Sequence, residues 1–162
     1  MNGEIIVRVA DLRVGADDDV LVTIGLGSCV AVVLHDATAK VGGLAHVLLP
    51  SQALSRKDDN NEAKFPQTAI PRLLELMSQR GAHTRRVTAR LAGGASMFAS
   101  LAAPGTIQMG ERNSVACRQV LIQHGVPIVA QATGGDYGRT VKLWVADGRV
   151  EISSVSHGVQ SL

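Results

Sequence analysis

The feature that most constrains the fold is a series of strand patterns that follow one another without an intervening helix. Runs rich in β-branched residues, a composition typical of strands, cover residues 4–9, 20–24, 29–35 and 41–49. A doubly wound parallel sheet needs a helical crossover between neighbouring strands. The first part of the chain therefore predicts consecutive strands joined by turns and excludes that fold class.

Two helical patterns come later in the chain. Apolar spacing predicts a helix that begins near Gln67 or Thr68. A second helix is predicted from Asn113, a favourable N-cap, to about His124. Further strands are predicted over residues 87–91, 126–130, 140–146 and 150–155, with a polar loop over 50–62. Seven or eight strands with two helices make an α+β protein.

Composition excludes several classes of protein. With 162 residues, 46% hydrophobic and 19% charged, the chain can bury a core and is not disordered. Aromatic residues are only 2% and the net charge is +2, which argues against nucleic-acid binding. Two cysteines cannot form a disulfide framework, and no run approaches 18 apolar residues.

These limits favour a cytoplasmic protein that does not insert into a membrane. Residues 1–4 carry no signal-peptide pattern. We expect a single domain over residues 1–155, followed by a flexible, frayed tail over residues 156–162.

Two residues with complementary chemistry lie in adjacent strand patterns. If Ala37 and Thr38 are the two turn residues, the numbers of opposed residues sum to 75, and Cys29 faces His46. Directly opposed Cβ atoms lie about 4.5–5.5 Å apart, within reach of a thiol–imidazole contact. Ala-Thr is not a preferred two-residue turn. A slip of one residue would put the pair on opposite faces, and a slip of two would leave diagonal neighbours.

A Cys–His pair of this kind suits nucleophilic catalysis. The thiolate is the nucleophile, and an adjacent imidazolium lowers the Cys pKa from about 8.5. Backbone amides near Gly27 and Ser28, just before Cys29, could turn inward and hold an oxyanion. Gly42 and Gly43 on the return strand would leave room for a substrate. The alternative is a small buried Cys beside a hydrogen-bonded core His.

The remaining Cys and His residues are weaker candidates. His35 lies on the same strand as Cys29 but about 20 Å away, too far to serve as its base. Cys117 is on an apolar helical stripe and is expected to be a core thiol, and surface positions are expected for His83, His124 and His157. No Cys or His pair has metal-ligand spacing, and no phosphate-binding glycine loop is present. We therefore expect neither a metal nor an organic cofactor.

A glycine-rich stretch carries two large apolar side chains. Met97 and Phe98 follow Gly93 and Gly94 in a predicted loop. An exposed Phe in such a loop would offer a contact surface. A Phe tucked into the core is equally consistent with the sequence.

Several motifs stand in order between about residues 20 and 155. They are Leu26-Gly27-Ser28-Cys29-Val30, Gly42-Gly43-Leu44-Ala45-His46, Leu48-Leu49-Pro50, Thr68-Ala69-Ile70, Gly93-Gly94-Ala95-Ser96-Met97-Phe98, Gly110-Glu111-Arg112-Asn113 and Gly134-Gly135-Asp136-Tyr137-Gly138-Arg139. Each motif alone is weakly specific, but the ordered set is highly specific. It resembles the chemoreceptor glutamine deamidase family (CheD).

The resemblance implies a hydrolase that converts selected glutamine side chains of bacterial chemoreceptors to glutamate. It implies a mixed, largely antiparallel β-sheet core with two main helices packed outside, related to toxin-type cysteine deamidases. The family's catalytic Cys and His fall on Cys29 and His46. Its third residue falls on Thr23, whose hydroxyl can accept the other imidazole N–H and fix the tautomer. The implied partners are chemoreceptor helices and a CheC-type phosphatase.

The resemblance has departures, and it leaves alternatives open. Gln67 and Ala132 stand where acidic residues are expected in many relatives, which puts fine specificity or partner contact in question. A non-catalytic chemotaxis adaptor that binds receptor or phosphatase remains an alternative function, as does a cysteine hydrolase of a small-molecule amide. The same machinery could also open a methyl ester weakly.

Overall fold

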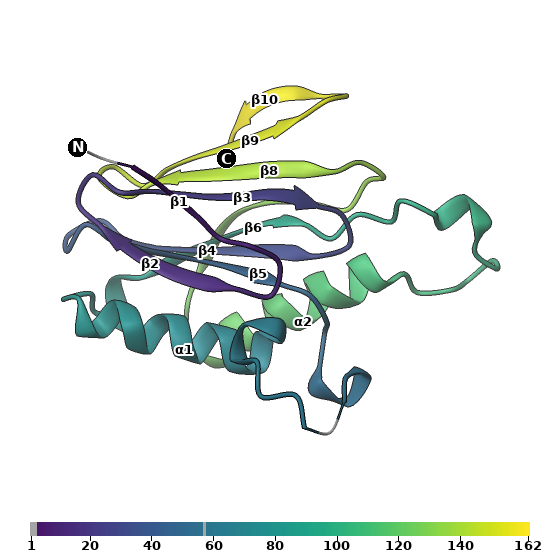
Figure 1. Cartoon of the computed structure of the whole chain (residues 1–162), viewed down its shortest axis with the longest axis horizontal. Coiled ribbons are helices and arrows are strands. Elements are labelled where there is room, and N and C mark those ends of the chain that lie inside the picture. The colour runs from purple at the N-terminus through teal and green to yellow at the C-terminus, as the bar shows by residue number, and fades with distance from the viewer. Residues whose placement is uncertain (1–2, 57) are drawn as a thin grey trace.

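Two five-stranded sheets and two helices form three layers (Figure 1). The computed structural model describes residues 3–56 and 58–162. Expectations from the sequence that concern Met1, Asn2 or Lys57 lie outside the described residues. The first sheet has the order β1-β3-β8-β9-β10, and the second has the order β2-β5-β4-β6-β7. The helices cover the face of the second sheet that points away from the first (Figure 1).

The strands are short. They are β1 (Glu4–Ile6), β2 (Leu12–Ala16), β3 (Val20–Leu26), β4 (Val30–Asp36), β5 (Val41–Val47), β6 (Thr88–Gly93), β7 (Ile128–Thr133), β8 (Arg139–Trp144), β9 (Arg149–Ser154) and β10 (Gly158–Ser161). Only the pairs β1–β3 and β6–β7 are parallel, and the other pairs are antiparallel. The α+β class and the mixed, largely antiparallel core are confirmed.

Strand β4 supplies side chains to two separate cores, because successive side chains point to opposite faces of a sheet. Val30, Val32 and Leu34 pack under the helices. Ala31 and Val33 pack between the two sheets. A strand that is buried on both faces has a nearly continuous run of apolar residues, and the sequence of β4 has such a run.

The two helices are α1 (Pro66–Gln79) and α2 (Met109–Gln123). Helix α1 begins close to its predicted start, with Pro66 in the first turn, where no intrahelical donor is required. Helix α2 begins before its predicted start, so Asn113 lies inside the helix and is fully buried. The expectation that Asn113 caps the helix is wrong, because its side-chain amide binds backbone carbonyls elsewhere.

The sequence patterns did not predict two of the strands, β2 and β10. Strand β2 pairs with β5 along its whole length, although its short segment lacks a run of β-branched residues. Strand β10 pairs with β9, and the Leu162 amide donates to the Val150 carbonyl over 2.9 Å. The expectation of a frayed tail over residues 156–162 therefore differs from the structure, because backbone pairing orders this polar segment.

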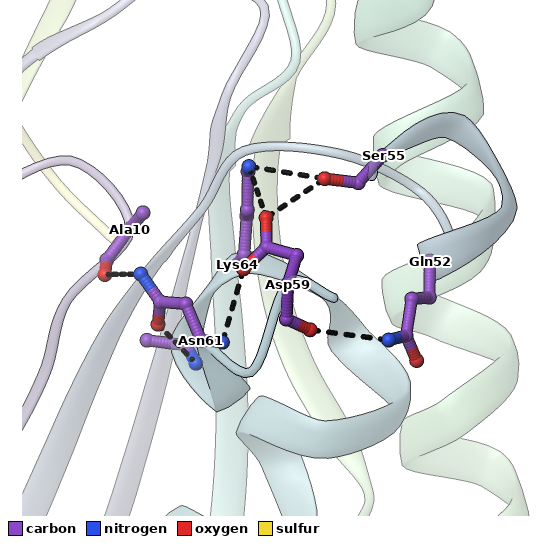
Figure 2. A network of polar contacts seen from close by, with 7 residues as sticks. Ala10, Gln52, Ser55, Asp59, Asn61 and Lys64 are labelled. Carbon is purple, nitrogen blue, oxygen red and sulfur yellow. Dashed lines mark hydrogen bonds and ion pairs between the residues drawn. The ribbon is translucent and has the colours of Figure 1, made fainter. Parts of the chain in front are cut away.

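The predicted loop after β5 contains three-residue 3-10 helices, η1 (Gln52–Leu54) and η2 (Glu62–Lys64), and it is tied by a polar network (Figure 2). The Asp59 carboxylate accepts from the Lys64 ammonium and the Ser55 hydroxyl, and these bonds hold its pKa down to about 2. The Asn61 side chain donates to the Ala10 carbonyl over 3.0 Å. This network fixes the loop against the turn that precedes β2.

Candidate functional site

The hairpin of β4 and β5 brings Cys29 and His46 to the same end of the sheet. Ala31 pairs with His46, and Val30 pairs with Val47. The numbers of opposed residues thus sum to 77 instead of 75. The predicted register, with Cys29 directly opposite His46, is wrong by two residues. The connection is a longer turn in which the Asp36 carboxylate accepts from the backbone amides of Thr38 and Ala39.

A slip of two residues keeps both side chains on one face. Cys29 belongs to the core between the sheets, as does Ala31. Cys29 precedes the first residue of β4 and is diagonal to His46. Diagonal Cβ atoms lie within about 7–8 Å, so a thiol and an imidazole ring can still meet across that gap.

Thr23 reaches this pair from the other sheet. Its hydroxyl oxygen lies 2.7 Å from His46 Nδ1 and 2.6 Å from the Val7 carbonyl oxygen. A carbonyl can only accept, so the single hydroxyl proton goes to Val7, and the Thr23 oxygen accepts from His46 Nδ1–H. The geometry therefore assigns the proton of the neutral imidazole to Nδ1 and leaves Nε2 with a free lone pair.

His46 Nε2 is buried and has no hydrogen-bond partner within the part of the chain that the structure describes. The backbone of His46 is held on both sides, since its amide donates to the Asp11 carbonyl and its carbonyl accepts from the Ala10 amide, each over 3.0 Å. The site thus contains a rigidly mounted imidazole with an unoccupied acceptor nitrogen.

Burial keeps both members of the pair neutral. It lowers the pKa of His46 from 6.5 to about 4, and it raises the pKa of the Cys29 thiol, although the backbone amide of Cys29 opposes that shift. The expected imidazolium–thiolate pair therefore does not describe the free protein at neutral pH. The Cys29 thiol and His46 Nε2 form no hydrogen bond among the residues described. A neutral thiol that comes within reach of a basic Nε2 can still react, with His46 taking the proton as the nucleophile forms.

The segment Gly27–Cys29 is attached through its carbonyl groups. The Gly27 carbonyl accepts from the Ala95 amide over 2.9 Å, and the Cys29 carbonyl accepts from the Gly94 amide over 2.8 Å. The Ser28 carbonyl accepts from the Asn113 side chain over 2.9 Å. No acceptor is found among the described residues for the amide N–H groups of this segment. Amides without a carbonyl acceptor, on the nucleophile candidate and the two residues before it, are donors that can stabilise an oxyanion.

Two glycines make this attachment possible. Gly93 has φ +106°, and a Cβ at this position would lie 2.4 Å from the Cys29 carbonyl oxygen. Gly94 has φ +63°, and a Cβ there would lie 2.2 Å from Ser114 Oγ. The backbone of these residues can approach the nucleophile segment only because they lack a side chain.

Of the two predicted contact residues, Met97 lies beside this segment and Phe98 is exposed on the surface. The Met97 sulfur lies 3.2 Å from where a Cβ on Gly27 would be. The Phe98 side chain is 72% exposed, so the expectation of a surface position is confirmed and the core alternative is wrong. Leu101 and Ile107 of the same loop are also exposed.

The glycine-rich segment 134–138 lies next to this loop. The Gly135 carbonyl accepts from the Ser96 amide over 2.9 Å, and the Gly134 amide donates to the Gly93 carbonyl over 3.0 Å. An open groove of about 450 Å³ begins here, lined in part by Ile24 and Tyr137. The groove borders the strand that carries Thr23 but does not include Cys29 or His46.

One sequence interpretation is overturned. Gly42 and Gly43 pair with residues at the far end of β4 from Cys29. A Cβ on Gly42 would lie 2.8 Å from a Leu143 methyl, and one on Gly43 would lie 3.0 Å from a Leu73 methyl. Core side chains therefore fill the space that was expected to hold a substrate.

The site also contains Asn113, which sequence reasoning missed. Asn113, Cys117 and Val120 share one helical stripe, and all three are buried. That spacing was a usable signal that Asn113 faces the core rather than caps the helix. Thr23 had no comparable signal apart from the family resemblance.

Across residues 3–56 and 58–162, no group of three or more His, Cys, Asp or Glu side chains could hold a metal ion. Cys117 is fully buried under α2, and burial raises its pKa to about 12. In the same described ranges, no helix is both long and apolar enough to cross a membrane.

Comparisons with known proteins identify the family that this chain resembles. The family model described as CheD chemotactic sensory transduction matches residues 48–154. A probable chemoreceptor glutamine deamidase CheD of Caldanaerobacter subterraneus subsp. tengcongensis is 46% identical over 95% of this chain and 94% of its own. The probable chemoreceptor glutamine deamidase CheD of Clostridium novyi is 42% identical over 98% of both chains. The chemoreceptor glutamine deamidase CheD of Halalkalibacterium halodurans is 38% identical over 100% of both chains.

Among solved structures, the hypothetical protein YfiH of Bacillus licheniformis is similar at a TM-score of 0.43 and 12% identity, over 70% of this chain and 46% of that chain. A likeness this distant supports no argument about function. The expected relation to toxin-type cysteine deamidases stays a prediction.

Proposed function

This chain belongs to the CheD family, and we propose from this premise that it is a protein-glutamine deamidase of bacterial chemoreceptors. The reaction replaces the side-chain amide of glutamine with a carboxylate and releases ammonia. The observation that carries the proposal is the free Nε2 lone pair of His46, oriented by Thr23 at the end of the sheet where Cys29 lies.

In the first half-reaction, His46 Nε2 takes the thiol proton of Cys29 as Sγ attacks the carboxamide carbon. The tetrahedral intermediate collapses when His46 returns that proton to the departing nitrogen, which leaves as ammonia. A thioester on Cys29 remains.

In the second half-reaction, water replaces ammonia. His46 removes a proton from water as the water oxygen attacks the thioester carbon. The carbon–sulfur bond then breaks, and the proton returns to Cys29. The new carboxyl group loses the second proton of the water to solvent and becomes the glutamate carboxylate. The free enzyme is regenerated, and the two half-reactions need no cofactor.

Thr23 orients the base. Because its only proton goes to the Val7 carbonyl, its oxygen accepts from Nδ1–H throughout the cycle. When His46 carries a second proton, that hydrogen bond also stabilises the imidazolium. The hydroxyl thereby fills the place that a carboxylate fills in many catalytic triads.

The oxyanion is held by backbone amides of Gly27, Ser28 and Cys29. The N–H groups of Ser28 and Cys29 belong to peptides whose carbonyl oxygens, those of Gly27 and Ser28, already accept hydrogen bonds. Donors that are already fixed in place need no reorganisation when charge develops on the substrate oxygen.

The substrate is a glutamine on an exposed face of a chemoreceptor cytoplasmic helix. Cys29 is only 8% exposed, so a single long side chain must enter while the rest of the helix stays outside. Met97 and Phe98 supply apolar contact next to the entrance. Activity on such helices places the protein in the cytoplasm, and a CheC-type phosphatase is a second partner that would compete for this surface.

The test is mass spectrometry of a chemoreceptor cytoplasmic fragment incubated with the protein and, separately, with Cys29→Ala. Conversion of specific glutamines to glutamate by the native protein alone supports the deamidase. Binding without conversion across cognate receptors contradicts it and favours an adaptor. Conversion of a small-molecule amide alone contradicts the protein substrate.

The same incubation tests a lesser activity. A methyl ester at the same position presents the same carbonyl carbon with a better leaving group, so weak methylesterase activity is expected from the same residues. Release of methanol from a methylated fragment, lost in Cys29→Ala, is the measurement.

A further inference from the structure

We propose that Asn113 is a positioning residue that sets the direction in which the backbone amide of Cys29 points. This inference rests on the proposed function, because it concerns the oxyanion site of that reaction. Asn113 is fully buried on α2, and its side-chain nitrogen donates to the Ser28 carbonyl over 2.9 Å and to the Leu48 carbonyl over 3.1 Å.

The orientation of the Asn113 amide is determined by its partners. Both are carbonyl oxygens, which only accept, so the NH₂ group must face them, and each of its hydrogens has one partner. Asn113 Oδ1 is buried and has no hydrogen-bond partner among the residues described. The reversed amide would set this oxygen against two carbonyl oxygens, which are also acceptors.

The hydrogen bond to Ser28 acts directly on the nucleophile's own amide. In a trans peptide the C=O of one residue and the N–H of the next lie in one plane and point in opposite directions. Holding the Ser28 carbonyl toward α2 therefore directs the Cys29 N–H away from α2. The Cys29 N–H and Sγ belong to the same residue, so this donor lies close to the thiol.

Within residues 3–56 and 58–162, Asn113 is the only side chain that binds a carbonyl group of the Gly27–Cys29 segment. The carbonyl groups of Gly27 and Cys29 are held by backbone amides, which every substitution except proline retains. The peptide between Ser28 and Cys29 depends on one side chain, 85 residues further along the chain.

The second hydrogen bond links the nucleophile to the base. Leu48 follows His46 by two residues, just after β5 ends, so Asn113 spans the segment that carries Cys29 and the strand that carries His46. A single amide thereby fixes the two halves of the site relative to each other.

The test compares Asn113→Ala and Asn113→Asp with Ser114→Ala. Asp keeps the shape of Asn but presents acceptors to two carbonyl oxygens. Ser114 is a matched control, because it is buried on the same helix and its hydroxyl donates within α2, to the Gly110 carbonyl. Folding of each variant is checked by ¹H–¹⁵N spectra and thermal melting.

Two reactions of the same thiol are then measured. Deamidation of a chemoreceptor fragment develops an oxyanion, whereas alkylation of Cys29 by iodoacetamide, located by mass spectrometry, displaces iodide and develops none. We expect both Asn113 variants to lose about 10- to 100-fold in kcat with little change in KM, somewhat less than the loss of a whole oxyanion donor. Alkylation should stay within about threefold of the native rate, and Ser114→Ala should match the native protein in both reactions.

Three results would overturn the proposal. Parallel loss of deamidation and alkylation would make Asn113 a general structural support of the pair. Unfolding of both Asn113 variants where Ser114→Ala stays folded would do the same. Native kcat in either Asn113 variant would remove any positioning role.

The ¹H–¹⁵N spectra separate this inference from the proposed function. Both Asn113 variants should shift or broaden the Cys29 amide resonance, and Ser114→Ala should not. If the native protein deamidates no receptor, the proposed function fails. A displaced Cys29 resonance with native alkylation would then still support the positioning role, and an unchanged resonance would overturn it.

Discussion

The two faces of the sheet that contains β4 differ sharply in chemistry. Toward the helices, the buried cluster is made of apolar side chains and the thiol of Cys117, and α2 adds the buried polar side chains of Asn113 and Ser114. Toward the other sheet, the core includes Cys29 and encloses the polar side chains of Thr23 and His46. Alternate residues of one strand thus serve a core that mainly stabilises and a core that holds the candidate Cys, His and Thr.

The two cysteines show what separates these environments. Burial raises the pKa of both thiols, so burial alone does not distinguish them. Cys29 has an imidazole nitrogen and free amides at its end of the sheet. Among the described residues, neither kind of group is found as a partner of Cys117. Under the proposed function, the difference in reactivity between the two thiols would come from the donors and acceptors that remain unoccupied near Cys29, rather than from the acidity of the thiol in the free protein.

The largest effect should come from removing the two thiols separately. Cys29→Ala should lower deamidation on the order of 10⁴-fold or more, as loss of a nucleophile does in other covalent enzymes. Cys117→Ala should leave kcat within about twofold. Deamidation of a receptor fragment, followed by mass spectrometry, checks both variants. Comparable losses of deamidation rate in the two variants would contradict a functional difference between the two faces.

A truncation on the helix side should affect stability instead. Leu121 is fully buried in the cluster under the helices, and Leu121→Ala should lower the free energy of unfolding by about 2–5 kcal/mol. Urea denaturation measures this change. Because the site lies on the other face, kcat at a temperature where the variant is folded should remain near native, and a large loss of kcat would contradict that separation.

On the sheet-facing side, Thr23→Val keeps shape and burial but removes both hydrogen bonds. The Val7 carbonyl and His46 Nδ1–H would lose their partner, at about 1–3 kcal/mol for a buried unpaired group. We expect kcat to fall about 10- to 100-fold. Thr23→Ser retains the hydroxyl and should recover most of the activity; equal losses in the two variants would rule out the orienting hydrogen bond.

The pH dependence should report the buried His46. Its pKa is 6.5 when exposed and about 4 in the folded protein, so activity should stay level at neutral pH and fall about tenfold per unit below about pH 4. Between about pH 4 and 6.5, His46 binds a proton in the unfolded chain but stays neutral in the folded protein. Stability should therefore decrease as pH falls from 6.5 toward 4, by up to about 1.4 kcal/mol per unit.

The matched control for that profile is His46→Gln, which lacks the titrating ring. Urea denaturation at several pH values should show a weaker slope in this window for the variant than for the native protein. Identical slopes would mean that His46 is protonated at its ordinary pKa in the folded protein.

The smallest effect should come from the exposed loop. Phe98→Ala removes an exposed ring outside the core, so stability should hardly change. Affinity for the receptor fragment should fall about threefold to tenfold, and titration calorimetry measures it. Unchanged affinity and turnover would remove the loop from the substrate surface.

Local patterns predicted more of the fold than of the site. The strand runs that became β3, β4 and β5 and the spacing that became α1 carry strong periodic signals. Strands β2 and β10 carry weak ones, because their order comes from pairing with β5 and β9 rather than from their own side chains.

Within the site, the choice of Cys29 and His46 came from strand adjacency, while the register was wrong by two residues. The error arose at the turn, where the Asp36 side chain binds two backbone amides and lengthens the connection. Turn chemistry sets hairpin register, and a wrong turn moves every opposed pair. Asn113 was misassigned for a related reason, since the same residue type suits a helix cap and a buried bridge between carbonyls.

The distance along the chain between Ser28 and Asn113 also has a consequence for biosynthesis. A chain that emerges from the ribosome exposes Cys29 and His46 well before α2, which brings the amide that fixes the nucleophile segment 85 residues after Ser28. Until that helix docks, the Ser28–Cys29 peptide has no side chain to hold it in one orientation. The nascent segment thus gains a fixed orientation of the Cys29 amide only after α2 has been synthesised and has docked.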